Sequence, residues 1–119
     1  PWIAVGIGGA LGSMVRYGLG RGIAHWFAAG HWPLATLLVN LFGCLAMGML
    51  AGAGMLGWLT PKVQLPLAVG VLGGFTTFSA FALELFGLGA TAHFGIAFAY
   101  LALSVFGGVL MIGLGMALV

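Results

Sequence analysis

The sequence is poor in charge. Lys and Arg together number three and Asp and Glu number one among 119 residues, so only 3% of the chain is charged. Soluble domains carry about 25% charged residues, which excludes that class for this chain. Hydrophobic residues make up 63% of the sequence and the mean hydropathy is +1.27, which indicates an integral membrane protein. The formal net charge of +2 rests on too few groups to indicate binding to nucleic acid.

Cysteine and catalytic groupings are also scarce. Cys44 is the only cysteine and lies in an apolar segment, so no disulfide can form within one chain and we interpret it as a core residue. The three histidines lack the spacing of metal ligands and have no cysteine or carboxylate nearby, which argues against a transition-metal site. No nucleophile with a base and an orienting group is present, and no phosphate-binding loop, so we expect no enzyme activity.

What the chain does have is apolar sequence long enough for four membrane-spanning helices at roughly 20 residues each. We predict a single all-α transmembrane domain over residues 1–119 and no separate soluble domain. The first apolar segment lacks the basic leading region of a signal peptide, so we expect it to be retained as a span. Its dense glycines predict close helix contacts on more than one face. The expected spans are about 2–24, 34–58, 65–86 and 92–119.

The few cations give little guidance for membrane orientation. Arg16 and Arg21 fall toward one face of the membrane and Lys62 toward the other. A difference of about one cation is a weak positive-inside signal, so the chain could insert in both orientations. Four short helices with small-residue faces also favour oligomerisation. We therefore expect an antiparallel, dual-topology homodimer embedded in the lipid bilayer.

A glycine and hydroxyl cluster, Gly73 to Ser79, interrupts the third apolar segment. Polar, irregular backbone at membrane depth is tolerated where it is buried in protein or lines a path. We predict two half-helices joined by a short unwound piece; a kink with threonines bonded back to carbonyls is the alternative. An unwound turn would free the carbonyls of Gly73 and Thr76. With the same pair from an antiparallel copy, they could hold a sodium ion.

Polar and aromatic residues near this cluster are candidates for a path. Asn40, about seven residues into the second helix, could donate to an anion or make an interhelical hydrogen bond that only fixes packing. Phe78 and Phe81 share a helix face just after the break. They could be core residues, or their electropositive ring edges could hold a small anion weakly enough to release it.

Two charges and two hydroxyls complete the candidates. Arg16 and Glu84 fall toward the same end of the bundle, so we expect a salt bridge between them. Alternatively, Glu84 is a proton-coupled carboxylate and Arg16 an anion-attracting vestibule charge. Tyr100 and Ser104 lie one turn apart on the fourth helix, where they could line a path or bond a neighbouring helix.

Three motifs spread over nearly the whole chain resemble one family, the Fluc/CrcB fluoride channels. They are Gly8-Gly9-Ala10-Leu11-Gly12 with Arg16-Tyr17, then Thr36 to Gly43, then Gly70 to Ser79. The resemblance implies a dual-topology homodimer with two antiparallel pores, which exports fluoride passively from the cytoplasm of a microbe. It also implies a structural sodium ion at the centre of the dimer.

The resemblance further assigns residues by position. The backbone oxygens of Gly73 and Thr76 match those that hold the sodium ion. Ala80 departs from the threonine of many members, which affects only a secondary polar contact. The residues matched to the anion path are Arg16, Asn40, Thr77, Phe78, Ser79, Phe81, Tyr100 and Ser104.

These features predict a fluoride-selective channel in the plasma membrane, the inner membrane in a Gram-negative cell. One rival is a small proton-coupled four-helix exporter of cationic compounds. Such an exporter needs a carboxylate in its first helix, whereas the only acid here is Glu84 in the third. A second rival is a non-conducting assembly subunit, which would tolerate the loss of Asn40 or Phe78.

Overall fold

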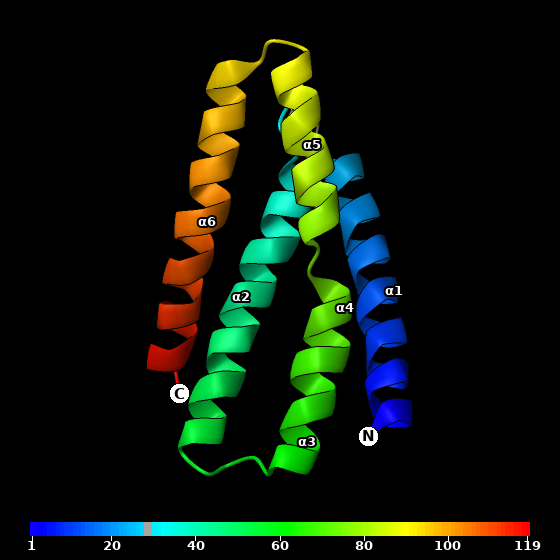
Figure 1. The fold of residues 1–119 in the computed structure, drawn as a ribbon, viewed down its shortest axis with the longest axis vertical. Helices are drawn as coiled ribbons and strands as arrows, with labels where there is room; N and C mark the ends of the chain where they lie inside the picture. The colour runs from blue at the N-terminus through cyan, green and yellow to red at the C-terminus, as the bar shows by residue number, and fades with distance from the viewer. Residues whose placement is uncertain (28–29) are drawn as a thin grey trace.

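The chain forms an elongated helical bundle of 47 × 28 × 24 Å (Figure 1). This computed structural model describes residues 1–27 and 30–119, and those residues form helices and connections with no strand. The helices are α1 (Trp2–Trp26), α2 (Leu34–Met55), α3 (Pro61–Leu65), the π-helix η1 (Pro66–Leu72), α4 (Gly73–Phe75), α5 (Phe78–Ala90) and α6 (Phe94–Ala117).

Two helix pairings organise the bundle. α6 packs along α2, and α1 packs against η1 and α4, while α5 leans on α6. The first and last residues of the chain lie toward the same end of the bundle, and the α5–α6 connection lies at the other end (Figure 1). At that second end the rings of His31 and His93 stack with centroids 3.9 Å apart, which joins two connections.

Three helical segments are long and apolar enough to cross a membrane: Leu34–Met55, Pro61–Ala90 and Phe94–Ala117. The first predicted span, α1, has 25 residues, but its glycines and arginines lower its hydropathy and it is not among the three. The bundle's 47 Å length is close to the ~40–45 Å of a bilayer with its headgroups. The expected membrane protein is therefore confirmed for these three segments.

Small residues bring α2 and α6 into backbone contact. A methyl group on Gly48 would overlap the carbonyl of Ile112, and one on Gly115 would overlap the carbonyl of Leu45 and lie 2.8 Å from the amide nitrogen of Met49. Because lipid is as apolar as the helices, such close packing is the main attraction between helices in a membrane.

Glycines on α1 make a second close contact, with η1 and α4. A methyl group on Gly8 would lie 3.0 Å from the carbonyl oxygen of Pro66, and one on Gly12 would lie 2.9 Å from the amide nitrogen of Phe75. By contrast, Gly6 and Gly18 have no atom in the way of a methyl group. Within one chain, the close contacts of the α1 glycines are therefore made with η1 and α4, and close contact on more than one face stays a prediction.

The π-helical segment η1 was not predicted. Pro66 has no N–H to donate within the helix, and its ring crowds the preceding turn. The following turns widen, so that the N–H of Gly73 is directed at the carbonyl of Ala68, five residues back. The wider turn faces the glycines of α1, and single π-helical turns of this kind are frequent at functional sites.

Two helix boundaries differ from the expected ones, because glycine and proline in the turn between α2 and α3 determine where these helices end and begin. α2 ends at Met55, not at residue 58, because Gly57 adopts a left-handed φ of 75°. The N–H of Trp58 then bonds the carbonyl of Ala53, which closes the helix end. The third helical segment begins early, at Pro61, since proline suits the first turn of a helix.

The end of α5 at Ala90 is closed in the same way. Ala92 takes a left-handed φ of 60°, and the N–H of His93 bonds the carbonyl of Leu88 at 2.8 Å. A residue other than glycine costs roughly 1 kcal/mol in this conformation. With this closing turn, α5 ends at Ala90, four residues beyond the expected end of the third span at 86.

The predicted break in the third segment is confirmed. Thr76 (ψ 157°) and Thr77 (φ −148°, ψ 120°) are extended between α4 and α5. The side chain of Asn40 on α2 clamps this break: its Oδ1 accepts from the N–H of Thr77 at 2.8 Å, and its Nδ2 donates to the carbonyl of Thr77 at 2.9 Å. The Oγ1 of Thr77 in turn accepts from the N–H of Ala80, which caps α5.

The α2–α6 contact makes a prediction for two glycines on one helix. Gly115→Ala is expected to lower the free energy of unfolding by about 1–3 kcal/mol, because its methyl group overlaps the backbone of α2. Gly113→Ala meets no atom within 4 Å and is expected to leave stability unchanged or raise it by up to about 1 kcal/mol. Thermal unfolding in detergent measures both; equal midpoints for the two variants would contradict the contact.

The clamp makes a second prediction. Asn40→Ala leaves the partly buried N–H and carbonyl of Thr77 without their partners, so the variant is expected to lose about 1–3 kcal/mol of stability. Hydrogen exchange at the amide of Thr77 should accelerate with it. Cys44→Ala, one turn along α2, is the control and should leave that amide protected. Unchanged exchange in Asn40→Ala would show that the clamp does not hold the break.

Candidate functional site

Two cavities flank the helix break. One has a volume of about 370 Å³ and the other about 410 Å³, and Thr77 lines both of them. The break therefore stands between two spaces in one bundle. We refer to them as the lower cavity, on the side of Phe78 and Ser104, and the upper cavity, on the side of Arg16.

The lower cavity gathers five of the predicted path residues. They come from α2, from the break, from α5 and from α6, and they are Asn40, Thr77, Phe78, Phe81 and Ser104. The rest of the lining is apolar or weakly polar, from Gly43, Cys44, Met47, Thr76, Val105 and Ile112. None of these lining residues is charged. The cavity thus offers hydrogen-bond donors and ring edges without a fixed charge.

Ser104 has the most unusual position in this lining. Its Oγ is buried, yet it has no hydrogen-bond partner within the described part of the chain. An orphan buried hydroxyl costs about 1–3 kcal/mol, so native structures seldom keep one without a purpose. Its hydroxyl is a donor without a protein acceptor, on a residue that lines the cavity.

The aromatic residues form a short stack beside the cavity. The ring centroids of Phe78 and Phe81 are 5.6 Å apart, and Phe81 meets Tyr100 edge-on at 5.1 Å. Phe78 is 78% exposed, whereas Phe81 is buried, so the first ring is free to meet lipid or another chain. Tyr100 is fully buried and lines neither cavity, so it supports Phe81 from behind.

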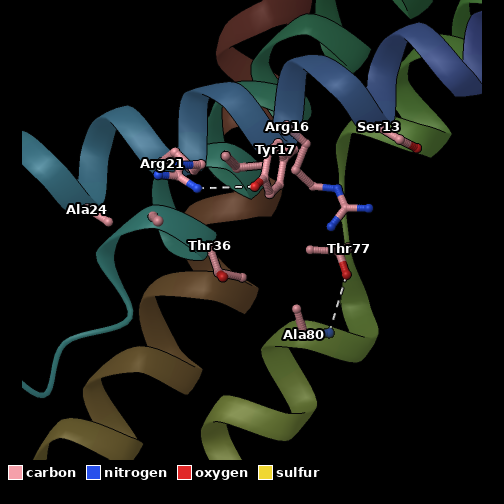
Figure 2. Close-up of a pocket in the computed structure, with 11 residues that line it drawn as sticks. Ser13, Arg16, Tyr17, Arg21, Ala24, Thr36, Thr77 and Ala80 are labelled. Carbon is pink, nitrogen blue, oxygen red and sulfur yellow. Dashed lines mark hydrogen bonds between the residues drawn. The ribbon is translucent and has the colours of Figure 1, made fainter.

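The upper cavity contains the predicted vestibule charge (Figure 2). The Nε of Arg16 donates to the carbonyl of Gly74 at 3.2 Å, and the rest of its guanidinium extends toward Thr77. Arg16 therefore sits directly above the break. The other predicted path residue of this region, Ser79, is exposed and lines neither cavity, although its Oγ lies 3.4 Å from the Oγ1 of Thr77.

The expected salt bridge between Arg16 and Glu84 is wrong. Arg16 bonds the Gly74 carbonyl, and Glu84 accepts instead from the hydroxyl of Tyr100 at 3.4 Å. The reason is that the break leaves a backbone carbonyl within reach of Arg16, while Glu84 lies further along α5 and faces α6. Glu84 lines neither cavity.

The clamp and the cap of α5 explain why the carbonyls of Gly73 and Thr76 have no helical partners. In a continuous helix, the N–H of Thr77 would bond the carbonyl of Gly73, and that of Ala80 would bond the carbonyl of Thr76. Here the first N–H is donated to Asn40 and the second to the Oγ1 of Thr77. Both carbonyls are thus released from helical pairing, as the predicted unwound turn requires.

The upper cavity also contains residues that sequence reasoning missed. Polar side chains of α1 recur every three or four residues along this face, and this period is the signal that could have found them. The stripe meets α2 and α5 only in the folded chain. The lining residues that were not predicted include Ser13, Tyr17, Arg21 and Thr36.

Comparison with known proteins shows the family to which the chain belongs. The family model described as CrcB-like protein, Camphor Resistance (CrcB), matches residues 3–116. A fluoride-specific ion channel FluC of Rhodospirillum centenum is 47% identical over 103 residues, which cover 86% of this chain and 81% of that protein. FluC proteins of Methylobacillus flagellatus and Thermus thermophilus are each 42% identical, over 97% and 96% of this chain and 91% and 89% of theirs. The helix break, its clamp and its two cavities thus occur in a chain that belongs to the CrcB family.

Proposed function

We propose that this protein is a fluoride-selective ion channel that lets fluoride leave the cytoplasm of a bacterium passively across its plasma membrane. The similar proteins carry the name fluoride-specific ion channel, and they match nearly the whole chain. Ion transport needs no catalytic group, and none of the predicted path residues forms a catalytic arrangement. Fluoride is the transported ion rather than a cofactor.

One observation carries the proposal. Ser104 lines an uncharged cavity together with Phe78 and Phe81, and its buried Oγ has no hydrogen-bond partner within the described residues. A fluoride ion there would accept a hydrogen bond from the hydroxyl and meet the electropositive edges of the rings. Asn40 can contribute as well, because its amide group has two N–H donors and the clamp uses one of them.

The absence of charge in the lower cavity's lining suits conduction. A full cation would hold the anion too tightly, whereas hydroxyl, amide and ring edges bind weakly enough for the ion to leave. Strong donors at close quarters favour the small fluoride ion over chloride, because chloride gains less from each short hydrogen bond. Arg16 lies outside this cavity, above the break, where it can attract anions without trapping them.

The working unit in this proposal is an antiparallel homodimer of four-helix chains, with α1 as the fourth span. Cations stand toward both ends of the bundle, Lys62 in α3 at one end and Arg21 in the later part of α1, which points to the other (Figure 1). This balance supports insertion in both orientations. The 78% exposure of Phe78 at the open side of the lower cavity supports a second chain covering that side.

A structural sodium ion between the two chains is part of the proposal. The released carbonyls of Gly73 and Thr76 are hard oxygen donors of the kind that sodium prefers. Their release follows from the diverted amides of Thr77 and Ala80. The residues therefore fit the ion, which would coordinate the carbonyl oxygens that the break leaves without helical hydrogen bonds.

Fluoride efflux from liposomes that contain the purified protein, followed with a fluoride electrode, tests the channel. The wild type is expected to release fluoride rapidly without a proton gradient and to release little chloride. Ser104→Ala should slow release at least about tenfold, because a hydrogen bond to a charged group contributes about 1.5–3 kcal/mol. Ser104 is a cleaner probe than Asn40, since its hydroxyl holds no other part of the protein in place.

Thr60→Ala is the matched control, because it removes an exposed hydroxyl remote from both cavities. It should conduct like the wild type. No fluoride release from folded wild-type protein would overturn the channel and leave the non-conducting subunit as the better explanation.

The sodium ion is tested by unfolding. A ligand that binds only the folded protein stabilises it, by about 2.7 kcal/mol at 100 times its dissociation constant. Protein purified without sodium should therefore melt at a higher temperature in sodium chloride than in potassium chloride of equal ionic strength. Identical midpoints in the two salts would speak against the ion.

A further inference from the structure

The upper cavity carries two cations and no acid in its lining. Arg16 and Arg21 both line it, and the remaining lining residues are neutral. The one acidic side chain of the sequence, Glu84, lies outside the lining and accepts from Tyr100. The field in this cavity is therefore positive, from two charges that no carboxylate in its wall offsets.

The two arginines differ in what holds them. Arg16 is anchored at the inner end by the carbonyl of Gly74, beside the break. Arg21 is anchored one turn from Tyr17 on the same helix: its Nη1 donates to the tyrosine hydroxyl at 3.2 Å, and its guanidinium carbon lies 5.9 Å from the centre of the ring. Figure 2 shows this bond along the wall of the cavity, with Ala24 beyond it and Thr77 on the other side of Arg16.

This anchoring matters because a free arginine on a surface samples many rotamers. Although Arg21 and Tyr17 are both exposed, the hydrogen bond and the ring contact favour rotamers that place the charge beside the cavity. A guanidinium has five N–H donors, and the bond to Tyr17 uses one. Arg21 can therefore meet an anion in the cavity while it remains bound to the tyrosine.

We propose that Arg21, positioned by Tyr17, is the outer charge of an anion-collecting vestibule, and that it concentrates small monovalent anions before they reach Arg16 and the break. Charges that line a concavity with low-dielectric walls focus the field and raise the local concentration of counter-ions. This inference rests on the proposed channel, since it assigns the residue that governs entry of its ion.

The alternative role for Arg21, near the end of α1, is to bind a lipid phosphate. The dependence of efflux on salt concentration distinguishes this role from that of an entry charge. Screening shortens the reach of an entry charge from about 30 Å at 0.01 M salt to about 3 Å at 1 M. A vestibule charge should therefore affect efflux strongly at low ionic strength and little at high ionic strength. A headgroup anchor should have no salt-dependent effect on the rate of entry.

The test compares two variants that each remove one positive charge. Arg21→Gln and Lys62→Gln are measured for fluoride efflux below saturating fluoride, at about 0.01 M and about 1 M of an impermeant salt. Lys62 is exposed and lines neither cavity, so it controls for net charge. Arg21→Gln should be slower than Lys62→Gln by roughly three- to tenfold at low salt and by less than about twofold at high salt.

Arg21→Lys should keep most of the wild-type rate at low salt, because the proposed role requires a positive charge at this position and not the paired N–H donors of a guanidinium. Equal low-salt rates for Arg21→Gln and Lys62→Gln, in liposomes where the wild type conducts, would overturn the inference and leave the channel intact. A wild type that does not conduct would instead overturn the proposed function itself. A deficit in Arg21→Gln that persists at high salt would also overturn the inference, in favour of a structural or lipid contact.

Discussion

The pair of hydrogen bonds between the side chain of Asn40 and the backbone of Thr77 is the interaction on which the rest of the structure depends. A helix that unwinds within apolar surroundings leaves polar backbone groups that no water can satisfy. The side-chain amide of Asn40 meets this need, because its oxygen accepts from the N–H of Thr77 and its nitrogen donates to the carbonyl of the same residue. The same bonds divert an amide from Gly73, so that stabilising the break also exposes the oxygen the proposed sodium ion would use.

The glycine contacts supply the rigidity that the break requires. α2 carries Asn40 and is fixed to α6, which carries Ser104, by backbone contact at Gly48 and Gly115. The part of the third segment that precedes the break, η1 and α4, is fixed to α1 at Gly12. Hydrogen-bond donors for a small ion must be held within fractions of an ångström, and small residues allow this by letting backbone rest on backbone.

Much of this architecture was predictable, because the relevant signals are local. Glycine and threonine within an apolar run predict the break at Gly73 to Ser79, and the structure has the break within this range. The path residues Asn40, Phe78, Phe81 and Ser104 were also named from the sequence, and the fold gathers them around one cavity. What they do there stays a proposal.

The failures have physical causes that lie outside short windows of sequence. The π-helical turn after Pro66 depends on a proline inside a helix and on the close approach that the glycines of α1 allow. The salt bridge between Arg16 and Glu84 was expected from their shared end of the bundle, but a nearer carbonyl captured the arginine. The upper cavity combines residues of α1, α2 and α5, and only the packing of those helices reveals it.

Thr77 shows how tightly these features are joined. Its N–H and carbonyl are bound by one side chain, its hydroxyl caps α5, and its surface belongs to both cavities. Thr77 is thus part of the wall of both spaces, and a displacement of this residue would alter both of them. A bundle in which one residue holds so many contacts is suited to keep a fixed arrangement around the break, rather than to turn a binding site from one side of the membrane to the other.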